Sequence, residues 1–371
     1  MGDELRVVSV VGARPNFVKM APVIAELDRR LDPGRHVLVH TGQHYDRMLS
    51  DVFLEELRVP PPDHVLAVGS GTHAQQTARV MERLEPVLLA EQPDLMIVPG
   101  DVNSTLATAL VAAKLHVPIA HVESGLRSFD RTMPEEINRL VTDQLASFLF
   151  VHCDEAVDNL RAEGIDEQRI HLVGNTMIDS LVAMEHRFRS LRMAARLGLQ
   201  AGEYVLVTLH RPALVDGPLL EPALRSLGQL ARELPVVLPV HPRTRERMQS
   251  LDPPPGVLIT EPFGYLEFLS LEADAAAVLT DSGGVQEETT FLGIPCFTLR
   301  STTERPITIS AGTNTLLGLD PARILDLPSL LAAAPGASPE PPPLWDGRAA
   351  ERLVGTLLEM PSPRPLAASR P

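Results

Sequence analysis

Cysteine is scarce in this sequence. Two of the 371 residues are Cys, and Cys153 and Cys296 lie far apart with no metal-binding or redox spacing around them. The pattern favours two small buried apolar residues and is typical of a reducing cytoplasm. His44, His121 and His152 have no metal-ligand spacing either. We therefore expect no metal.

Basic residues are also few. The chain has 33 Lys and Arg residues against 48 Asp and Glu residues, a formal net charge of −15. A nucleic-acid partner is not expected, because the basic surface that binds phosphate backbones is missing. Any anion-binding site must be a local cluster of cationic side chains and helix N-termini in an acidic protein.

Two further absences concern membranes and dinucleotides. The sequence contains no apolar run long enough to span a bilayer, and Met1–Arg6 lacks the features of a signal peptide. We therefore expect a cytoplasmic protein without a membrane partner. The first predicted turn between strand and helix reads Gly12-Ala13-Arg14-Pro15, which is not G-x-G-x-x-G. This difference argues against an NAD cofactor.

The sequence does contain a regular alternation of short apolar runs and helical segments. In the first half the expected strands are Leu5–Val11, Arg35–His40, Leu95–Val98, Pro118–Val122 and Phe148–Val151. The expected helices between them are Asn16–Arg30, Asp46–Leu57, Ala74–Ala90, Val102–Leu115 and Glu135–Leu145. Near-continuous apolar strands separated by helices predict a parallel sheet with helices on both faces.

The pattern then restarts, after a long predicted helix at Met177–Leu197. The second series of strands is Val205–Thr208, Val236–Val240, Val257–Thr260, Ala275–Thr280 and Cys296–Leu299. The fold class is therefore α/β, with two Rossmann-like, doubly wound parallel-sheet domains facing a cleft. We expect an N-terminal domain at 1–174 and a C-terminal domain at 175–345. A last helix and tail at 346–371 is expected to pack back on the N-terminal domain.

The most informative stretch runs from Thr280 to Glu288. A predicted strand is followed by Ser282, Gly283 and Gly284 and then by the start of a helix, a combination that binds phosphate well. Glycine lets the backbone approach an anion closely, and Glu288 can hold a sugar hydroxyl beside the phosphate. An ordinary capped turn between strand and helix has the same sequence pattern.

Carboxylates and cations follow other predicted strands of the first half. Asp101, Glu123 and Glu135 come from three separate strand ends or loops, and converging carboxylates can divide into an acid and a base. Arg14 and Lys19 can neutralise a phosphate or a leaving group. Taken singly, each carboxylate is more often a helix cap or a favourable first-turn residue, and Lys19 fits a solvated helix residue equally well.

Histidine and aromatic residues follow strands of the second half. His210 and His241 each end a predicted strand, where an imidazole can contact phosphate or move protons. A structural hydrogen-bonding role is the commoner one. Phe263 and Tyr265 can flank a nucleobase or pack in the core, and Arg305 lies in a loop after the last strand.

Together these segments resemble the bacterial non-hydrolysing UDP-N-acetylglucosamine 2-epimerases, which share the two-domain fold of GT-B glycosyltransferases. The resemblance extends from about Val7 to Asp320. The segments that carry it are Gly12–Pro15, Thr41–Tyr45, Gly100–Thr105, His121–Ser128, Pro134–Arg139, Val173–Thr176, His210–Pro212, His241–Arg243, Thr280–Glu288 and Thr303–Pro306.

The resemblance implies a reaction and a set of site residues. UDP is eliminated from UDP-GlcNAc to give 2-acetamidoglucal and is added back to give UDP-ManNAc, without NAD or metal, in a homodimer. The implied catalytic residues are Asp101, Glu123, Glu135 and His210. The implied substrate-binding residues are Arg14, Lys19, His241, Phe263, Ser282, Gly283, Gly284, Glu288 and Arg305. Gln43 and His44 lie in the segment suited to an allosteric UDP-GlcNAc site.

Several alternatives remain open at this point. Leu214 stands where relatives commonly carry Asn, which puts allosteric activation in doubt, and Ser124 replaces a usual Ala. A hydrolysing epimerase, or an epimerase of a modified sugar such as a 2,3-diacetamido uronic acid, shares nearly all the motifs. A GT-B glycosyltransferase has no need of carboxylates serving both faces of C2. A catalytically silent nucleotide-sugar sensor is disfavoured, because Asp101, Glu123 and Glu135 are all present.

Overall fold

The computed structural model describes residues 5–42, 54–240, 242–248, 250–333 and 340–359. The chain divides into two compact units, one of residues 1–182 and 343–371 (unit 1) and one of residues 183–342 (unit 2). Each unit contains one sheet with helices packed around it, and every strand pair is parallel. The predicted fold class, two parallel-sheet α/β units, is confirmed. The division between the units falls within helix α7 (Thr176–Leu191).

The sheet of unit 1 has seven strands in the order β3-β2-β1-β4-β5-β6-β7. Five match the predicted strands and are β1 (Val7–Val11), β2 (His36–His40), β4 (Leu95–Pro99), β5 (Ile119–Val122) and β6 (Phe148–Val151). The edge strands β3 (His64–Val65) and β7 (Ile170–Leu172) were not predicted. They are two and three residues long and partly exposed, so they lack the apolar run that marks the central strands.

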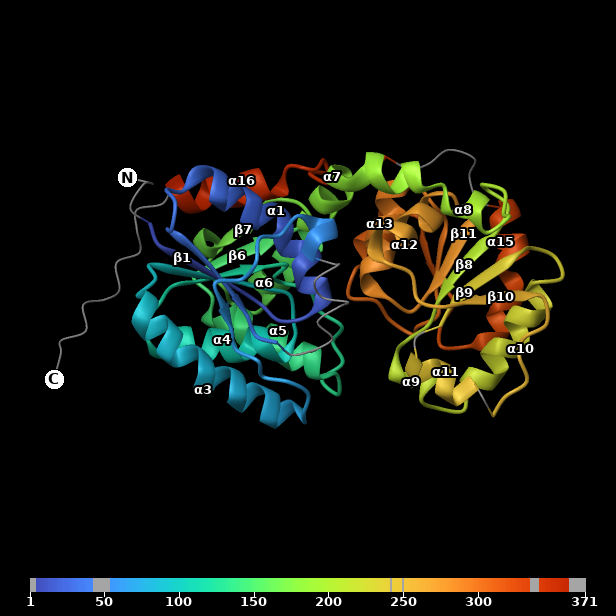
Figure 1. Ribbon diagram of the computed structural model, residues 1–371, viewed down its shortest axis with the longest axis horizontal. Helices are drawn as coiled ribbons and strands as arrows, with labels where there is room; N and C mark the ends of the chain where they lie inside the picture. Colours follow the sequence, from blue (N-terminus) through green and yellow to red (C-terminus); the bar gives the residue numbers. More distant parts are fainter. Residues whose placement is uncertain (1–4, 43–53, 241, 249, 334–339, 360–371) are drawn as a thin grey trace. The chain divides into compact units, whose positions relative to one another are not determined.

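Helices cover both faces of this sheet. They are α1 (Arg14–Arg30), α3 (His73–Glu91), α4 (Asn103–Lys114), α5 (Pro134–Leu145), α6 (Asp154–Ala162), η2 (Glu167–Arg169) and α16 (Ala349–Glu359). Helices α1 and α16 lie side by side on one face, and α3, α4 and α5 lie on the other (Figure 1). The buried Asp179 carboxylate of α7 accepts hydrogen bonds from the backbone N–H groups of Ala349 and Ala350 (3.1 and 2.7 Å). These bonds fix the start of α16 within unit 1.

The sheet of unit 2 has six strands in the order β10-β9-β8-β11-β12-β13. They are β8 (Val205–Thr208), β9 (Val236–Pro239), β10 (Val257–Thr260), β11 (Ala277–Thr280), β12 (Cys296–Thr298) and β13 (Asn314–Leu316). Only β13 was not predicted. It has three residues, Asn-Thr-Leu, and joins the sheet by pairing with β12.

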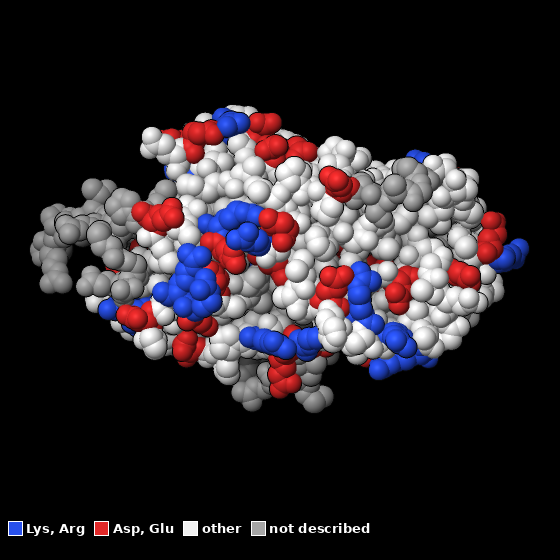
Figure 2. All heavy atoms as spheres, turned by 90° about the horizontal axis from the view of Figure 1, so that it is seen from above, with Lys and Arg blue, Asp and Glu red and all other residues white. Residues whose placement is uncertain are grey.

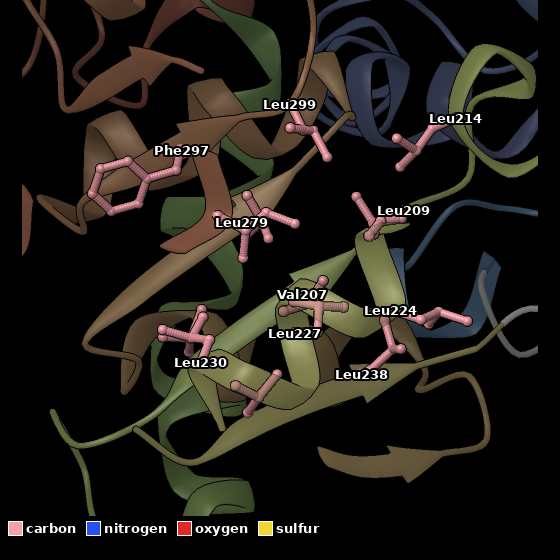
Figure 3. Packing of buried hydrophobic residues seen from close by; sticks show 14 of the residues in the cluster. Val207, Leu209, Leu214, Leu224, Leu227, Leu230, Leu238, Leu279, Phe297 and Leu299 are labelled. Atoms are coloured by element: carbon pink, nitrogen blue, oxygen red, sulfur yellow. The ribbon is translucent and has the colours of Figure 1, made fainter. Parts of the chain in front are cut away.

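The helices of unit 2 pack two cores against its sheet. They are α8 (Met193–Arg196), α9 (Pro212–Val215), α10 (Leu220–Leu230), α11 (Pro242–Met248), α12 (Tyr265–Ala273), α13 (Gly283–Leu292), α14 (Ile307–Ser310), η3 (Pro321–Asp326) and α15 (Leu327–Ala333). Side chains alternate along a strand, so Val207 of β8 joins Leu224 and Leu227 of α10 in one core (Figure 3). Leu206 enters the other core, with Leu271 of α12.

One prediction about the helices was wrong. The single helix expected at Met177–Leu197 is interrupted at Arg192, whose backbone is left-handed (φ 49°). The Met193 N–H, freed from a helical partner, donates to the Ser270 hydroxyl of α12 (3.2 Å). The sequence around Arg192 contains neither Gly nor Pro, so local propensity gives no sign of the break.

The charged surface agrees with the composition. On the face that Figure 2 displays, Lys and Arg side chains lie among Asp and Glu side chains rather than in one basic area. Within the described part of the chain, no helix is both long and apolar enough to cross a membrane.

Candidate active site

The polar residues of unit 1 gather at the carboxyl ends of neighbouring strands. Strand β1 lies beside β4, and β4 lies beside β5, so the turns after these three strands meet at one edge of the sheet. Asn16 of α1 joins two of these turns. Its Oδ1 accepts from the backbone N–H groups of Gly12 and Ala13 (3.2 and 3.1 Å), and its Nδ2 donates to the Pro99 carbonyl (3.3 Å).

A buried ion pair lies at this edge. The Lys19 ammonium from α1 bonds the Glu123 carboxylate, and both side chains are more than nine-tenths buried. Glu123 has a left-handed backbone (φ 67°), which is uncommon for a residue with a side chain and is concentrated at functional sites. A Cβ atom on Gly100 would lie 3.1 Å from Lys19 Nζ and 3.3 Å from Glu123 Oε2. Glycine at position 100 therefore leaves room for the pair.

Asp101 is held from helix α5. Arg139 Nε donates to Asp101 Oδ2 (2.9 Å), and Asn138 Nδ2 donates to the Asp101 carbonyl (2.8 Å). The alternative that Asp101 caps α4 is wrong, since the cap residue is Val102 and no side chain caps that helix. The Asp101 side chain remains 27% exposed, so it is accessible to a ligand while Arg139 fixes its orientation.

Glu135 lies on α5, the helix that also carries Asn138 and Arg139. It is half-buried in the first turn of α5, which packs on α4. The neighbouring Glu136 is buried and accepts from the backbone N–H groups of Ser128 and Phe129 (2.9 and 3.0 Å) and from Arg139 Nη1 (2.6 Å). Glu136 thus anchors the loop before α5 and links it to the cation beside Asp101.

In unit 2, His210 is fixed by a residue that the sequence analysis did not select. The buried Asp281, directly after β11, pairs with His210 Nδ1 (2.8 Å). It also accepts from the backbone N–H groups of His210 and Arg211 (2.9 and 2.7 Å). The imidazole is 52% exposed. Asp281 therefore sets the turn after β8 and leaves the ring accessible.

The predicted anion site lies at the start of α13. Ser282 is the cap residue and Gly283 is the first helical residue. Arg305 pairs with Glu287 of the same helix (3.0 Å), and a Cβ atom on Gly283 would lie 2.8 Å from Arg305 Cζ. The structure thus brings together a helix N-terminus, a guanidinium and a glycine that leaves space, with Gly284 following as the next helical residue. A phosphate group is well matched to this combination.

A buried carboxyl group, that of Glu288, lies further along the same helix. Glu288 accepts from the Tyr265 hydroxyl (2.7 Å). Burial raises the pKa of the Glu288 carboxyl to about 7, against the effect of the Tyr265 hydrogen bond and with a contribution from Glu287. Phe263 is partly buried and packs against the core that contains Tyr204. This agrees with the alternative that Phe263 packs in the core.

Some predicted residues cannot be placed. Gln43, His44 and His241 lie outside the described residues. Arg14 begins α1, and its side chain lies outside the description. In the described part of the chain, no group of three or more His, Cys, Asp or Glu side chains is arranged to hold a metal.

Comparisons with known proteins agree on one family. The UDP-N-acetylglucosamine 2-epimerase family profile matches residues 28–358. The chain belongs to this family. A UDP-N-acetylglucosamine 2-epimerase of Methanococcus maripaludis is 41% identical, covering 85% of this chain and 89% of the relative. A UDP-2,3-diacetamido-2,3-dideoxy-D-glucuronate 2-epimerase of Pseudomonas aeruginosa is 43% identical, with 85% and 88% covered.

A solved structure of the family has the same fold. The UDP-GlcNAc 2-epimerase of Methanocaldococcus jannaschii, in complex with UDP-GlcNAc and UDP, superimposes with a TM-score of 0.83 at 38% identity and covers 95% of this chain and 99% of the solved chain. The resemblance inferred from the motifs is confirmed, and the chain is a sugar-nucleotide epimerase, an enzyme of the isomerase class.

One prediction concerns the epimerase's unit 2. The Asp281→Ala variant is expected to lower the free energy of unfolding of unit 2 by about 1–3 kcal/mol, because two backbone N–H groups of the turn after β8 lose their buried, charged acceptor. Scanning calorimetry measures the change. The exposed Asp252→Ala variant is the control, and equal stability of the two variants would contradict the structural role of Asp281.

Proposed function

We propose that this epimerase interconverts UDP-GlcNAc and UDP-ManNAc. The observation that carries the proposal is the Lys19–Glu123 ion pair at the strand edge that also bears Asp101. This edge of the sheet carries two carboxylates, and each is paired with its own cation. One solved structure of the family contains UDP-GlcNAc and UDP. Two carboxylates are what a reaction with separate proton-removing and proton-delivering groups requires.

The proposed reaction proceeds by elimination and addition. The C2 proton of the sugar is not acidic, so departure of UDP must first build positive charge at C1. The C1–O bond breaks with its electron pair leaving on UDP, and one carboxylate takes the C2 proton to give 2-acetamidoglucal. A second group then delivers a proton to the opposite face of C2 while a UDP oxygen bonds C1 again. The product is an isomer of the substrate, in which a new proton at C2 replaces the one that was removed.

The described geometry suggests how the acid/base work is divided. We assign Asp101, Glu123 and Glu135 as the acid/base carboxylates, with His210 assisting near the phosphates or the C2 region. The contact of the Lys19 ammonium with Glu123 supports Glu123 as the base. Asp101 is more accessible, and Arg139 fixes the orientation of its carboxylate.

The UDP moiety is assigned to unit 2. Ser282, Gly283 and Gly284 at the start of α13, together with Arg305, are proposed to bind the diphosphate, and Glu288 the ribose hydroxyls. These groups stabilise the negative charge that develops on departing UDP. We propose that the reaction needs neither NAD nor a metal, because side chains are assigned to every proton transfer and to the leaving group.

This assignment predicts that UDP binding depends on pH. Ribose hydroxyls donate to an ionised Glu288, whose pKa is raised to about 7 by burial. Below pH 7 the carboxyl is increasingly protonated, so the apparent Kd for UDP is expected to rise about tenfold per pH unit, and binding there should release a proton. Calorimetric titrations at pH 6 and 8, in two buffers of different ionisation enthalpy, measure both effects.

The Glu288→Gln variant tests whether Glu288 causes the pH dependence of UDP binding. It should bind UDP more weakly at pH 8 and should lose the proton release. If the variant keeps the wild-type pH dependence, another group is responsible and the ribose assignment fails.

A second substrate deserves a direct comparison, because the P. aeruginosa relative named for a diacetamido-glucuronate substrate is 43% identical to this chain. Proton NMR in D2O with UDP-GlcNAc tests the proposal. Growth of UDP-ManNAc with deuterium at C2 would support it. Free ManNAc with stoichiometric UDP would indicate a hydrolysing enzyme. If the spectrum is unchanged and the enzyme turns over the UDP-diacetamido-glucuronate substrate, that compound would take the place of UDP-GlcNAc in the proposal.

The quaternary state and regulation are also proposals. The family resemblance favours a homodimer, which sedimentation equilibrium tests. An allosteric UDP-GlcNAc site at Gln43 and His44 predicts sigmoidal kinetics. Leu214, buried in α9, stands where relatives commonly carry Asn, so hyperbolic kinetics would indicate that activation has been lost.

A further inference from the structure

The proposed chemistry gives no role to His121, a buried histidine of unit 1. His121 lies in β5, two residues before Glu123, and is fully buried. Its Nδ1 lies 2.6 Å from Asp143 Oδ1, and its Nε2 lies 2.7 Å from the Gly100 carbonyl oxygen. Gly100 directly precedes Asp101. The imidazole therefore lies between helix α5 and the turn that bears a proposed catalytic carboxylate.

The hydrogen-bond partners determine the protonation of this ring. A carbonyl oxygen only accepts, so Nε2 must carry a proton. Asp143 accepts from the Gly125 N–H (3.1 Å) and pairs with Arg127 (2.7 Å) through its other oxygen. Burial opposes ionisation of Asp143, but His121 and Arg127 outweigh it and lower the pKa of the carboxyl. An ionised Oδ1 also only accepts, so Nδ1 must carry a proton too.

The surrounding charges compensate this cation. Arg127, almost fully buried, lies between Asp143 and the partly exposed Glu163, to which it makes two bonds of 2.7 Å. His121, Asp143, Arg127 and Glu163 thus form a line of alternating charge. Such a line lowers the cost of burying a charged group, because every charge has an opposite neighbour.

The same pair of side chains fixes two catalytic turns. His121 holds the carbonyl of Gly100, whose φ is 63°, and Asp143 holds the N–H of Gly125, two residues beyond Glu123. We propose that His121 is a doubly protonated positioning residue which, with Asp143, holds the turns bearing Asp101 and Glu123 in their reactive geometry. The proposal rests on the acid/base roles in the proposed function.

The His121→Gln variant tests the positioning role. The substitution removes the cation and is expected to displace both turns by a fraction of an ångström. A misplacement of a full ångström lowers the rate about 100-fold, so kcat should fall by less than that, about tenfold. KM and UDP affinity should change little, and the acid limb of the pH–rate profile should shift. The control is His36→Gln, since His36 in β2 bonds Asp28 and Ser9 in a similar way (2.6 and 2.9 Å).

A measurement without substrate keeps this inference separate from the proposed function. In ¹⁵N NMR of the wild-type enzyme at pH 7.5, both His121 ring nitrogens should carry protons, as their hydrogen-bond partners require. A neutral ring at pH 7.5 would overturn the proposal even if the His121→Gln variant does not fold. Wild-type kcat in a folded His121→Gln enzyme would overturn it as well.

Discussion

Replacing Glu123 by Gln is expected to lower kcat roughly 10²- to 10⁴-fold, the usual contribution of a positioned acid or base. The amide keeps the shape of the side chain but cannot take the C2 proton. Lys19 then lies beside a neutral group instead of a carboxylate. UDP binding should persist, because the assigned UDP-binding groups are in unit 2. Steady-state kinetics and UDP calorimetry measure the two effects separately.

The Asp101→Asn variant is expected to behave in the same way. Its amide can still accept from Arg139, so the turn should keep its structure while proton transfer is lost. Glu167→Gln provides a control, because Glu167 is an exposed carboxylate paired with Arg161 on the surface. Full activity in both Glu123→Gln and Asp101→Asn would remove the acid/base assignment.

The second large effect is expected at the start of α13. In Gly283→Ala, the new methyl group would lie 2.8 Å from Arg305 Cζ and must displace the guanidinium. Arg305 is buried and is held by Glu287, so it cannot simply rotate into solvent. Loss of a charge-assisted contact of about 1.5–3 kcal/mol predicts UDP binding weakened ~10- to 100-fold.

Calorimetric titration with UDP measures that loss, and circular dichroism checks that the variant is folded. Gly217→Ala is the matched control in the same unit, since its Cβ would lie 3.6 Å from the nearest atom, the Ala213 carbonyl oxygen. If Gly283→Ala and Gly217→Ala bind UDP equally well, the diphosphate does not bind where we assign it.

The central strands could be predicted because they are encoded locally. Apolar runs such as Phe148–Val151 and Val205–Thr208 match the observed β6 and β8. The edge strands β3 and β13 could not be predicted, because two or three residues carry too little pattern and their pairing depends on a neighbouring strand. The break at Arg192 was missed for a similar reason, since Ser270, which accepts from the next N–H group, is distant in the sequence.

The site was only partly accessible from the sequence. Asp101 and Glu123 were selected because they follow strands, where ligands bind in parallel sheets. Arg139 and Asp281 were missed as site residues. Their roles depend on partners 38 and 71 residues away, and a single sequence does not reveal such pairs. The available signals were the positions of Arg139 in the Pro134–Arg139 segment and of Asp281 in the Thr280–Glu288 segment.

The sequence by itself determined the α/β class and the residue types at the strand ends, because alternating apolar runs and glycine turns are local properties. Only the tertiary structure decided which charges meet. The Lys19–Glu123 pair joins residues 104 positions apart, and the His121–Asp143 pair joins two different elements. Electrostatic interactions depend on distance in space and on burial, and neither quantity is set until the strands and helices have packed.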